Sequence, residues 1–141
     1  MKKTFLALSV LSMAFVSCKK DDKKEQITPT KENLTGSYKL TAATIAGVNV
    51  FNNSNESFNW WEACERDDIY KLNANLTMEY IDAGTQCNPP DGWTSTWALP
   101  STTTFTKDGE TYDIKSWDGT TLVVEDDISA TEKITETYTK Q

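Results

Sequence analysis

TYDIKSWDGTTLVVE, residues 111–125, is the stretch that decides the fold class of this chain. On both sides of its centre, apolar and polar side chains alternate, as they do in half-buried strands. The centre is Asp118-Gly119, a two-residue hairpin signal, because glycine adopts the positive φ that such turns require. The stretch therefore predicts two antiparallel strands, over 111–117 and 120–125.

Six further runs have the same character, being rich in Thr, Tyr, Trp, Val and Ile and separated by Gly, Asn, Asp and Pro. They cover residues 36–45, 67–73, 76–82, 93–99, 103–106 and 133–139. Two longer connections separate some of them: the Asn-rich residues 46–63, with a short helical turn expected at Trp60 and Trp61, and the loop 87–92. Eight strands joined in sequence predict an all-β, antiparallel up-and-down meander that closes into a small barrel, because closure removes exposed edges.

The first 17 residues have the pattern of a targeting segment rather than of a folded domain. Lys2 and Lys3 precede the uncharged, mostly apolar run Thr4–Val16. As a helix this run would be about 20 Å long, which is short of the ~30 Å hydrocarbon core of a bilayer. We therefore expect residues 1–17 to be a cleaved export signal rather than a membrane-spanning anchor.

A cysteine follows this signal directly. FVSC, residues 15–18, resembles a lipobox, although that motif usually has leucine where Phe15 stands. We therefore expect Cys18 to carry lipid and to anchor the protein to a membrane; the alternative is an ordinary secretory signal with an incidental cysteine. Residues 18–33 are polar and charged, and they predict a disordered tether. Their CKKDD start also resembles the tail of some Gram-negative lipoproteins that reach the outer leaflet of the outer membrane. We expect an outer-membrane location, with the domain either at the cell surface or facing the periplasm.

The remaining residues, 34–141, have the size of one domain. They contain 17 acidic and 7 basic residues. A strongly acidic surface argues against nucleic acid or an anionic membrane face as a partner, because both require a cationic surface.

Two cysteines remain after Cys18, and they are expected to form one bond. In an oxidising exported setting, Cys64 and Cys87 are most simply a disulfide. The sequence contains no histidine, so it offers no Ser-His-Asp or Cys-His arrangement and no imidazole metal ligand. The acidic doublets at 67–68 and 126–127 are expected to be solvated turn residues. We therefore predict neither an enzyme nor a metal site or cofactor.

At this point the chain resembles a known family. LTGSY, residues 34–38, resembles the Gly-x-Trp start of lipocalins. The order Cys64, Asp67-Asp68, Ile69-Tyr70, Cys87 and then Trp93 or Trp97 resembles the short lipocalin-like domain of bacterial lipoproteins. The resemblance covers residues 34–126 and implies an eight-stranded barrel. Tyr38 stands in place of the family tryptophan, and no arginine follows in the last strand to pack over it, so Lys133 or Lys140 would have to substitute.

The resemblance also implies a cup that holds one small ligand or is filled by its own side chains. The inward rows that would line it are Tyr70, Leu72, Met78, Tyr80, Trp97, Ile114 and Leu122. Trp60 and Trp61 would either line the mouth or plug one end. Two functions follow: a binding module for a small apolar or amphipathic ligand, or an interaction lipoprotein that docks a protein or glycan through its loops. An open cavity above about 300 Å³ would favour the first.

Overall fold

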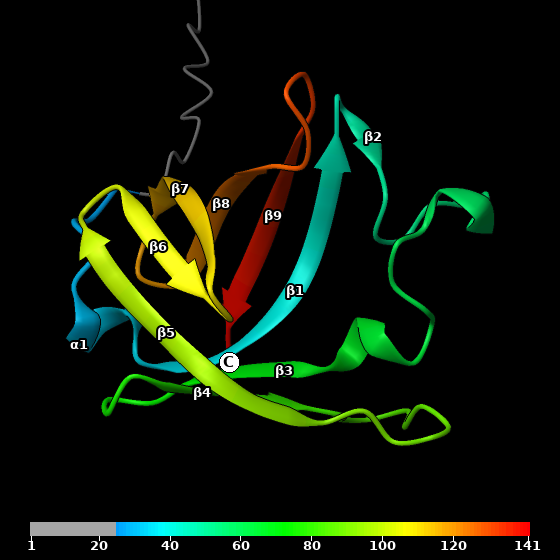
Figure 1. Cartoon of the computed structure of the whole chain (residues 1–141), viewed down its shortest axis with the longest axis horizontal. Coiled ribbons are helices and arrows are strands. Elements are labelled where there is room, and N and C mark those ends of the chain that lie inside the picture. Colours follow the sequence, from blue (N-terminus) through cyan, green and yellow to red (C-terminus); the bar gives the residue numbers. More distant parts are fainter. Residues whose placement is uncertain (1–24) are drawn as a thin grey trace, which may run out of the picture.

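The computed structural model describes residues 25–141, and the strands within this part form one barrel (Figure 1). The predicted export signal and Cys18 lie outside the described residues. The barrel strands are β1 (Gly36–Ile45), β3 (Ile69–Leu72), β4 (Thr77–Ile81), β5 (Trp93–Ser101), β6 (Thr104–Lys107), β7 (Glu110–Trp117), β8 (Thr121–Asp127) and β9 (Lys133–Lys140). No helix in residues 25–141 has the length and apolar character needed to cross a membrane.

Closure of the barrel comes from the first and last strands. All neighbours pair antiparallel in chain order, and β1 also pairs with β9, from Tyr38 opposite Lys140 to Ile45 opposite Ile134. The predicted all-β, eight-stranded up-and-down barrel is confirmed. One extra strand, β2 (Val48–Asn49), pairs only with the end of β1.

The up-and-down topology gives the barrel two different ends. One end, called the mouth here, carries the connections 46–68, 82–92, 108–109 and 128–132. The other end, called the base, carries the short helix α1 (Lys31–Leu34) and the connections 73–76, 102–103 and 118–120. Figure 1 shows α1 on one side of the barrel and the connection between β2 and β3 on the opposite side.

The base is closed by a lysine over two aromatic rings. The Lys140 ammonium lies 5.8 Å from the ring centroids of Tyr38 and Trp117 and donates a hydrogen bond to the Asn33 carbonyl. The Tyr38 hydroxyl donates to the carbonyl of Leu34, which is fully buried. Lys140 therefore takes the position over Tyr38, whereas Lys133 pairs with Glu125 near the mouth.

The domain begins earlier than the sequence predicts. The Ile27 amide donates to the Trp117 carbonyl at 2.8 Å, and the Trp117 amide donates to the Gln26 side chain. Thr30 and Asn33 then form a capping box at the start of α1. The prediction of a disordered tether is therefore wrong for residues 26–33. Composition measures how much apolar surface a segment can bury, but this polar segment is held by hydrogen bonds.

A bulge changes which face of β1 points inward. The register with β9 shifts between Leu40 and Ala42, so Ala43 is fully buried whereas Ala42 is exposed. Strict alternation predicts Tyr38, Leu40 and Ala42 on one face. That prediction is wrong for Ala42, because a bulge adds a residue and reverses the alternation beyond it.

The connection 46–68 has two single-turn 3₁₀ helices, η1 (Glu56–Phe58) and η2 (Glu65–Asp67). The helical turn expected at Trp60 and Trp61 lies instead at η1. The Asn55 side chain explains this position, because it accepts a hydrogen bond from the Ser57 amide and caps the turn.

Candidate functional site

The interior of the barrel is filled by its own side chains. The space at its centre amounts to about 10 Å³, roughly the room for one water molecule. Of the residues predicted to line a cup, Leu72, Met78, Tyr80, Trp97 and Leu122 are buried, and Tyr70 and Ile114 are partly buried against the same core. Six of these seven residues pack in one core, and Tyr80 lies beside it, in ring contact with Tyr70 and hydrogen-bonded to Asp68. The core leaves no room for a ligand.

The ammonium group of Lys107 is buried at the end of this core that is nearer the mouth. The Lys107 nitrogen lies 4.9 Å from the ring centroids of Tyr70, Tyr112 and Tyr138. It also forms an ion pair with Glu136 at 3.1 Å, and the side chains are only 11% and 7% exposed. Aromatic faces and a carboxylate together replace the water that a cation loses on burial.

Tyr138 completes this arrangement. Its hydroxyl donates to Glu136 at 2.6 Å and accepts a hydrogen bond from Lys107. Burial, with a further contribution from the Glu136 charge, raises the pKa of Tyr138 well above its ordinary value, so the hydroxyl stays protonated. An apolar ligand entering here would have to displace a satisfied ion pair. One signal in the sequence pointed to this pair: Glu136 lies between Ile134 and Tyr138 on the same, inward face of β9.

The two adjacent tryptophans of the mouth have different surroundings. Trp61 packs edge-on against Phe51 at 5.7 Å, and its carbonyl accepts hydrogen bonds from Arg66. Trp60 is 56% exposed. Trp61 therefore helps to plug the barrel end, and Trp60 faces solvent.

Trp60 borders an open groove of about 360 Å³, which we call the mouth groove. Its walls come from the end of β1, from β2, from the region of η1 and from the β8–β9 turn. The lining residues are Ile45, Ala46, Val48, Val50, Ser57, Phe58, Trp60, Ile128 and Glu132. Val48 and Phe58 are 45% and 50% exposed, so large apolar side chains meet solvent on this part of the mouth. Of these residues, the sequence singled out only Trp60.

The part of the groove wall from Val50 to Trp60 is held in shape largely by individual hydrogen bonds. The Val50 amide donates to the Ala43 carbonyl, which ties one end of the wall to β1. The Trp60 amide donates to the Val50 carbonyl, which holds the other end against the first. Asparagine side chains supply further backbone hydrogen bonds: Asn49 accepts from the Phe51 amide, and Asn59 accepts from the Asn53 amide. The Asn-rich composition thus has a structural role, since asparagine readily bonds nearby backbone groups.

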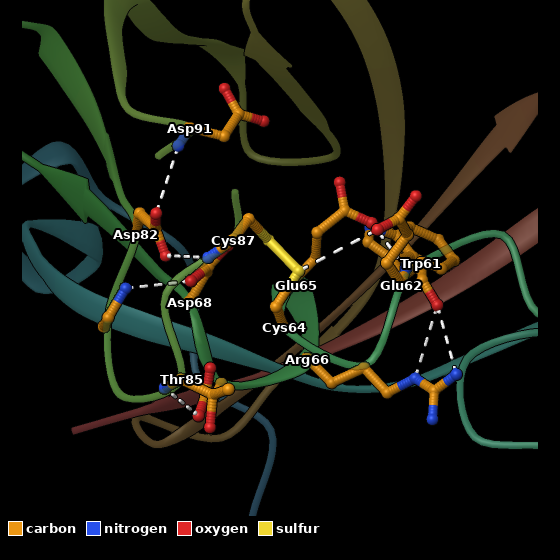
Figure 2. Close-up of a disulfide and its surroundings, with 12 residues drawn as sticks. Trp61, Glu62, Cys64, Glu65, Arg66, Asp68, Asp82, Thr85, Cys87 and Asp91 are labelled. Atoms are coloured by element: carbon orange, nitrogen blue, oxygen red, sulfur yellow. Dashed lines mark hydrogen bonds between the residues drawn. A yellow bond between two sulfur atoms is a disulfide. The ribbon is translucent and has the colours of Figure 1, made fainter. Parts of the chain in front are cut away.

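The predicted disulfide is present and anchors the same connection (Figure 2). Cys64 and Cys87 are bonded, with their Cα atoms 5.2 Å apart. The bond joins the connection 46–68 to the loop between β4 and β5. Figure 2 also shows Arg66 reaching back to the Trp61 carbonyl, and Arg66 forms an ion pair with Glu56 at 3.0 Å. The groove wall is therefore fastened to the barrel beyond its own hydrogen bonds.

The first acidic doublet differs from its predicted solvated state. Asp68 is 1% exposed and accepts hydrogen bonds from the Tyr80 hydroxyl and the Ala83 amide. Its neighbour Asp67 accepts from the Thr85 amide, so both carboxylates organise the loop after β4. The prediction of solvated turn residues is wrong for Asp68. No group of three potential metal ligands occurs within residues 25–141.

Comparisons with protein-family models, with curated proteins and with solved structures find no match to this chain. The lipocalin-like resemblance therefore rests on the residues quoted above, and function has to be argued from the geometry.

Proposed function

We propose that this protein is a lipid-anchored docking module, which binds a polypeptide partner by taking one of its apolar side chains into the mouth groove. One observation carries the proposal: the barrel interior has space for about one water molecule, whereas the groove at the mouth offers about 360 Å³. A carrier of the lipocalin kind needs its space inside the barrel. A docking module needs it on the surface.

Exposed aromatic side chains support this choice. Trp60 and Phe58 are each at least half exposed beside the groove, and such residues are enriched among those that dominate binding energy at protein interfaces. The wall that carries them is fastened by the disulfide and by Arg66. Little ordering entropy would then be lost on binding, which favours affinity.

The lining favours a polypeptide over a glycan. Apart from Ser57 and Glu132, the side chains around the groove are apolar. A sugar ring carries several hydroxyl groups, and each one buried without a hydrogen-bond partner is costly. An aliphatic or aromatic side chain of a peptide has no such requirement.

A lipid anchor at Cys18 would leave the mouth groove free to meet a partner. The described chain begins at the base, where Gln26 and Ile27 contact Trp117. The chain from Cys18 to Gln26 can span at most about 26–29 Å when fully extended. A membrane at Cys18 would therefore lie nearer the base, and the mouth would be free to meet a partner. We place the protein on the outer membrane, displayed at the cell surface.

Site-specific photo-crosslinking in living cells tests the proposal. A photoreactive phenylalanine analogue replaces Phe58 at the groove, and the same analogue replaces Ile81 as a matched control. Ile81 is exposed to 38% and does not line the groove. We expect a discrete adduct containing a second polypeptide from position 58, none from position 81, and loss of the adduct when Trp60→Ala is added.

Three outcomes would overturn the docking proposal. These are equal adducts from both positions, no adduct from either, or an adduct at position 58 whose added mass is glycan or lipid. Circular dichroism of each purified variant checks that the barrel has folded.

A further inference from the structure

We infer that the partner segment is basic: the apolar side chain that enters the mouth groove is flanked by lysine or arginine. This inference rests on the proposed function and names the chemistry of the partner.

Charge is distributed unevenly along the barrel. The four connections of the mouth contain nine acidic residues and a single basic one, Arg66. The rest of residues 25–141 contains ten acidic and seven basic residues. Arg66 is 17% exposed and already pairs with Glu56, so it offers little positive charge to a partner. The mouth therefore attracts cations and repels anions during approach.

One carboxylate lies at the groove itself. Glu132 is exposed on the β8–β9 turn and lines the groove. Within residues 25–141 its side chain has no ion pair, because the adjacent Lys133 is bound to Glu125 at 3.1 Å and to Asp127 at 3.0 Å. A neutral partner covering the groove would strip water from Glu132 without replacing it. A partner with a cation at this edge would supply the missing charge.

The aromatic side chains of the groove suit the same partner. The faces of tryptophan and phenylalanine attract ammonium and guanidinium groups, and Trp60 and Phe58 lie beside the apolar lining. The aliphatic stems of lysine and arginine can also cover such surface while their charged ends stay in water. An apolar side chain with basic neighbours would therefore satisfy the lining, the rings and Glu132 together.

A matched set of peptides tests the inference. Three fluorescent peptides share a central leucine and differ only in its two flanking residues, which are lysine, glutamine or glutamate. Their dissociation constants are measured by fluorescence anisotropy with the full lipidated protein in neutral detergent. The titrations are run at about 0.1 M and at about 1 M salt. The Debye length is about 10 Å at the lower concentration and about 3 Å at the higher one, so charge effects are screened in the second titration.

We expect the lysine peptide to bind at least about tenfold more tightly than the glutamate peptide at low salt, and this ratio to fall towards one at high salt. Glu132→Gln should weaken the lysine peptide about two- to fivefold and leave the glutamine peptide unchanged. Asp113→Asn removes the same charge from the exposed wall of β7, and it should have no such effect.

The outcomes separate this inference from the docking proposal. If the glutamine or glutamate peptide binds as well as the lysine peptide, and Trp60→Ala weakens all three, the groove docks peptides but the basic partner is wrong. If none of the three binds, the docking proposal fails together with the inference. If Asp113→Asn weakens the lysine peptide as much as Glu132→Gln does, only overall charge matters and Glu132 has no assigned role.

Discussion

A single residue, Lys107, fills part of the space in the barrel interior. Its ammonium fills the place among Tyr70, Tyr112 and Tyr138 that a ligand would otherwise take. The cation is kept there by Glu136, which lies on the facing strand β9. An eight-stranded up-and-down barrel therefore does not by itself imply a carrier, because the inward side chains determine whether the barrel has room for a ligand.

Breaking this ion pair is expected to destabilise the fold. Lys107→Met or Glu136→Leu leaves one buried charge without its partner, and each should lower the free energy of unfolding by about 3–5 kcal/mol. The double variant should cost clearly less than the sum, since neither charge is then stranded. Urea denaturation of the wild type, the two single variants and the double variant measures the coupling free energy between Lys107 and Glu136. Strictly additive effects would show that the two side chains do not interact.

The inward residues of the barrel could be predicted from the sequence, whereas the residues of the mouth groove could not. The inward places of Leu72, Met78 and Trp97 follow from alternation, because burial of one sheet face enforces it. The groove does not follow, since Val48 and Phe58 lie in a two-residue strand and a single-turn helix, which are too short to show a repeating pattern. Their proximity to Ile128 is set by the closure of β1 on β9, which joins positions far apart in sequence.

At the scale of elements, the connection 46–68 contains only one two-residue strand and two single-turn 3₁₀ helices. The 3₁₀ helix η1 is held by the Asn55 side-chain cap. The 3₁₀ helix η2 has no such cap and is held by Arg66 and by the disulfide at Cys64. The eight barrel strands were predictable because most of their residues alternate with a period of two, although register shifts interrupt three of the strand pairs. The strand β2 was not, because two residues are too short to show a period.

Reducing the disulfide should therefore act on this connection first. Closing a loop of this length contributes about 3 kcal/mol in the chain-entropy model, and we expect Cys64→Ser with Cys87→Ser to lose about that amount. Limited proteolysis should then cut the variant within residues 46–68 before it cuts the barrel strands. Thiol titration of the oxidised, denatured wild-type protein provides the check. Two reactive thiols from Cys64 and Cys87 would contradict the bond.

At the scale of the whole molecule, all five tyrosines belong to the barrel. Burial raises the pKa of each above its ordinary value near 10, and neighbouring carboxylates add to the rise for four of them. The five are Tyr38, Tyr70, Tyr80, Tyr112 and Tyr138. The folded barrel therefore holds protons that the unfolded chain releases.

This difference predicts a sharp loss of stability in alkali. Above pH 10 the unfolded state binds fewer protons than the folded state, so the free energy of unfolding falls as pH rises, by up to about 1.4 kcal/mol per pH unit for each tyrosine. Below pH 10 this contribution is fully present. Tyrosinate absorbance and circular dichroism, followed together, should change in one cooperative step above pH 10. Gradual ionisation of a barrel that stays folded would contradict the assignment.

Anchoring also belongs to this scale. We expect Cys18→Ala to abolish labelling of the protein with radioactive fatty acid and to release it from the membrane fraction, because several buried acyl chains make attachment nearly irreversible. Cys64→Ser with Cys87→Ser should leave labelling intact. Continued labelling of Cys18→Ala would refute the lipid anchor.

The short path from the proposed anchor to the mouth groove would have a mechanical consequence. From the base, the chain runs through α1 into β1, and β1 ends at Ile45 and Ala46, which already line the groove. Part of any tension between a membrane and a docked partner would therefore pass through β1, pulled along its length. The hydrogen bonds that join β1 to β9 and β3 lie across that direction. These hydrogen bonds would be loaded together in shear rather than opened one at a time. The barrel would therefore resist unfolding when a docked partner pulls on it.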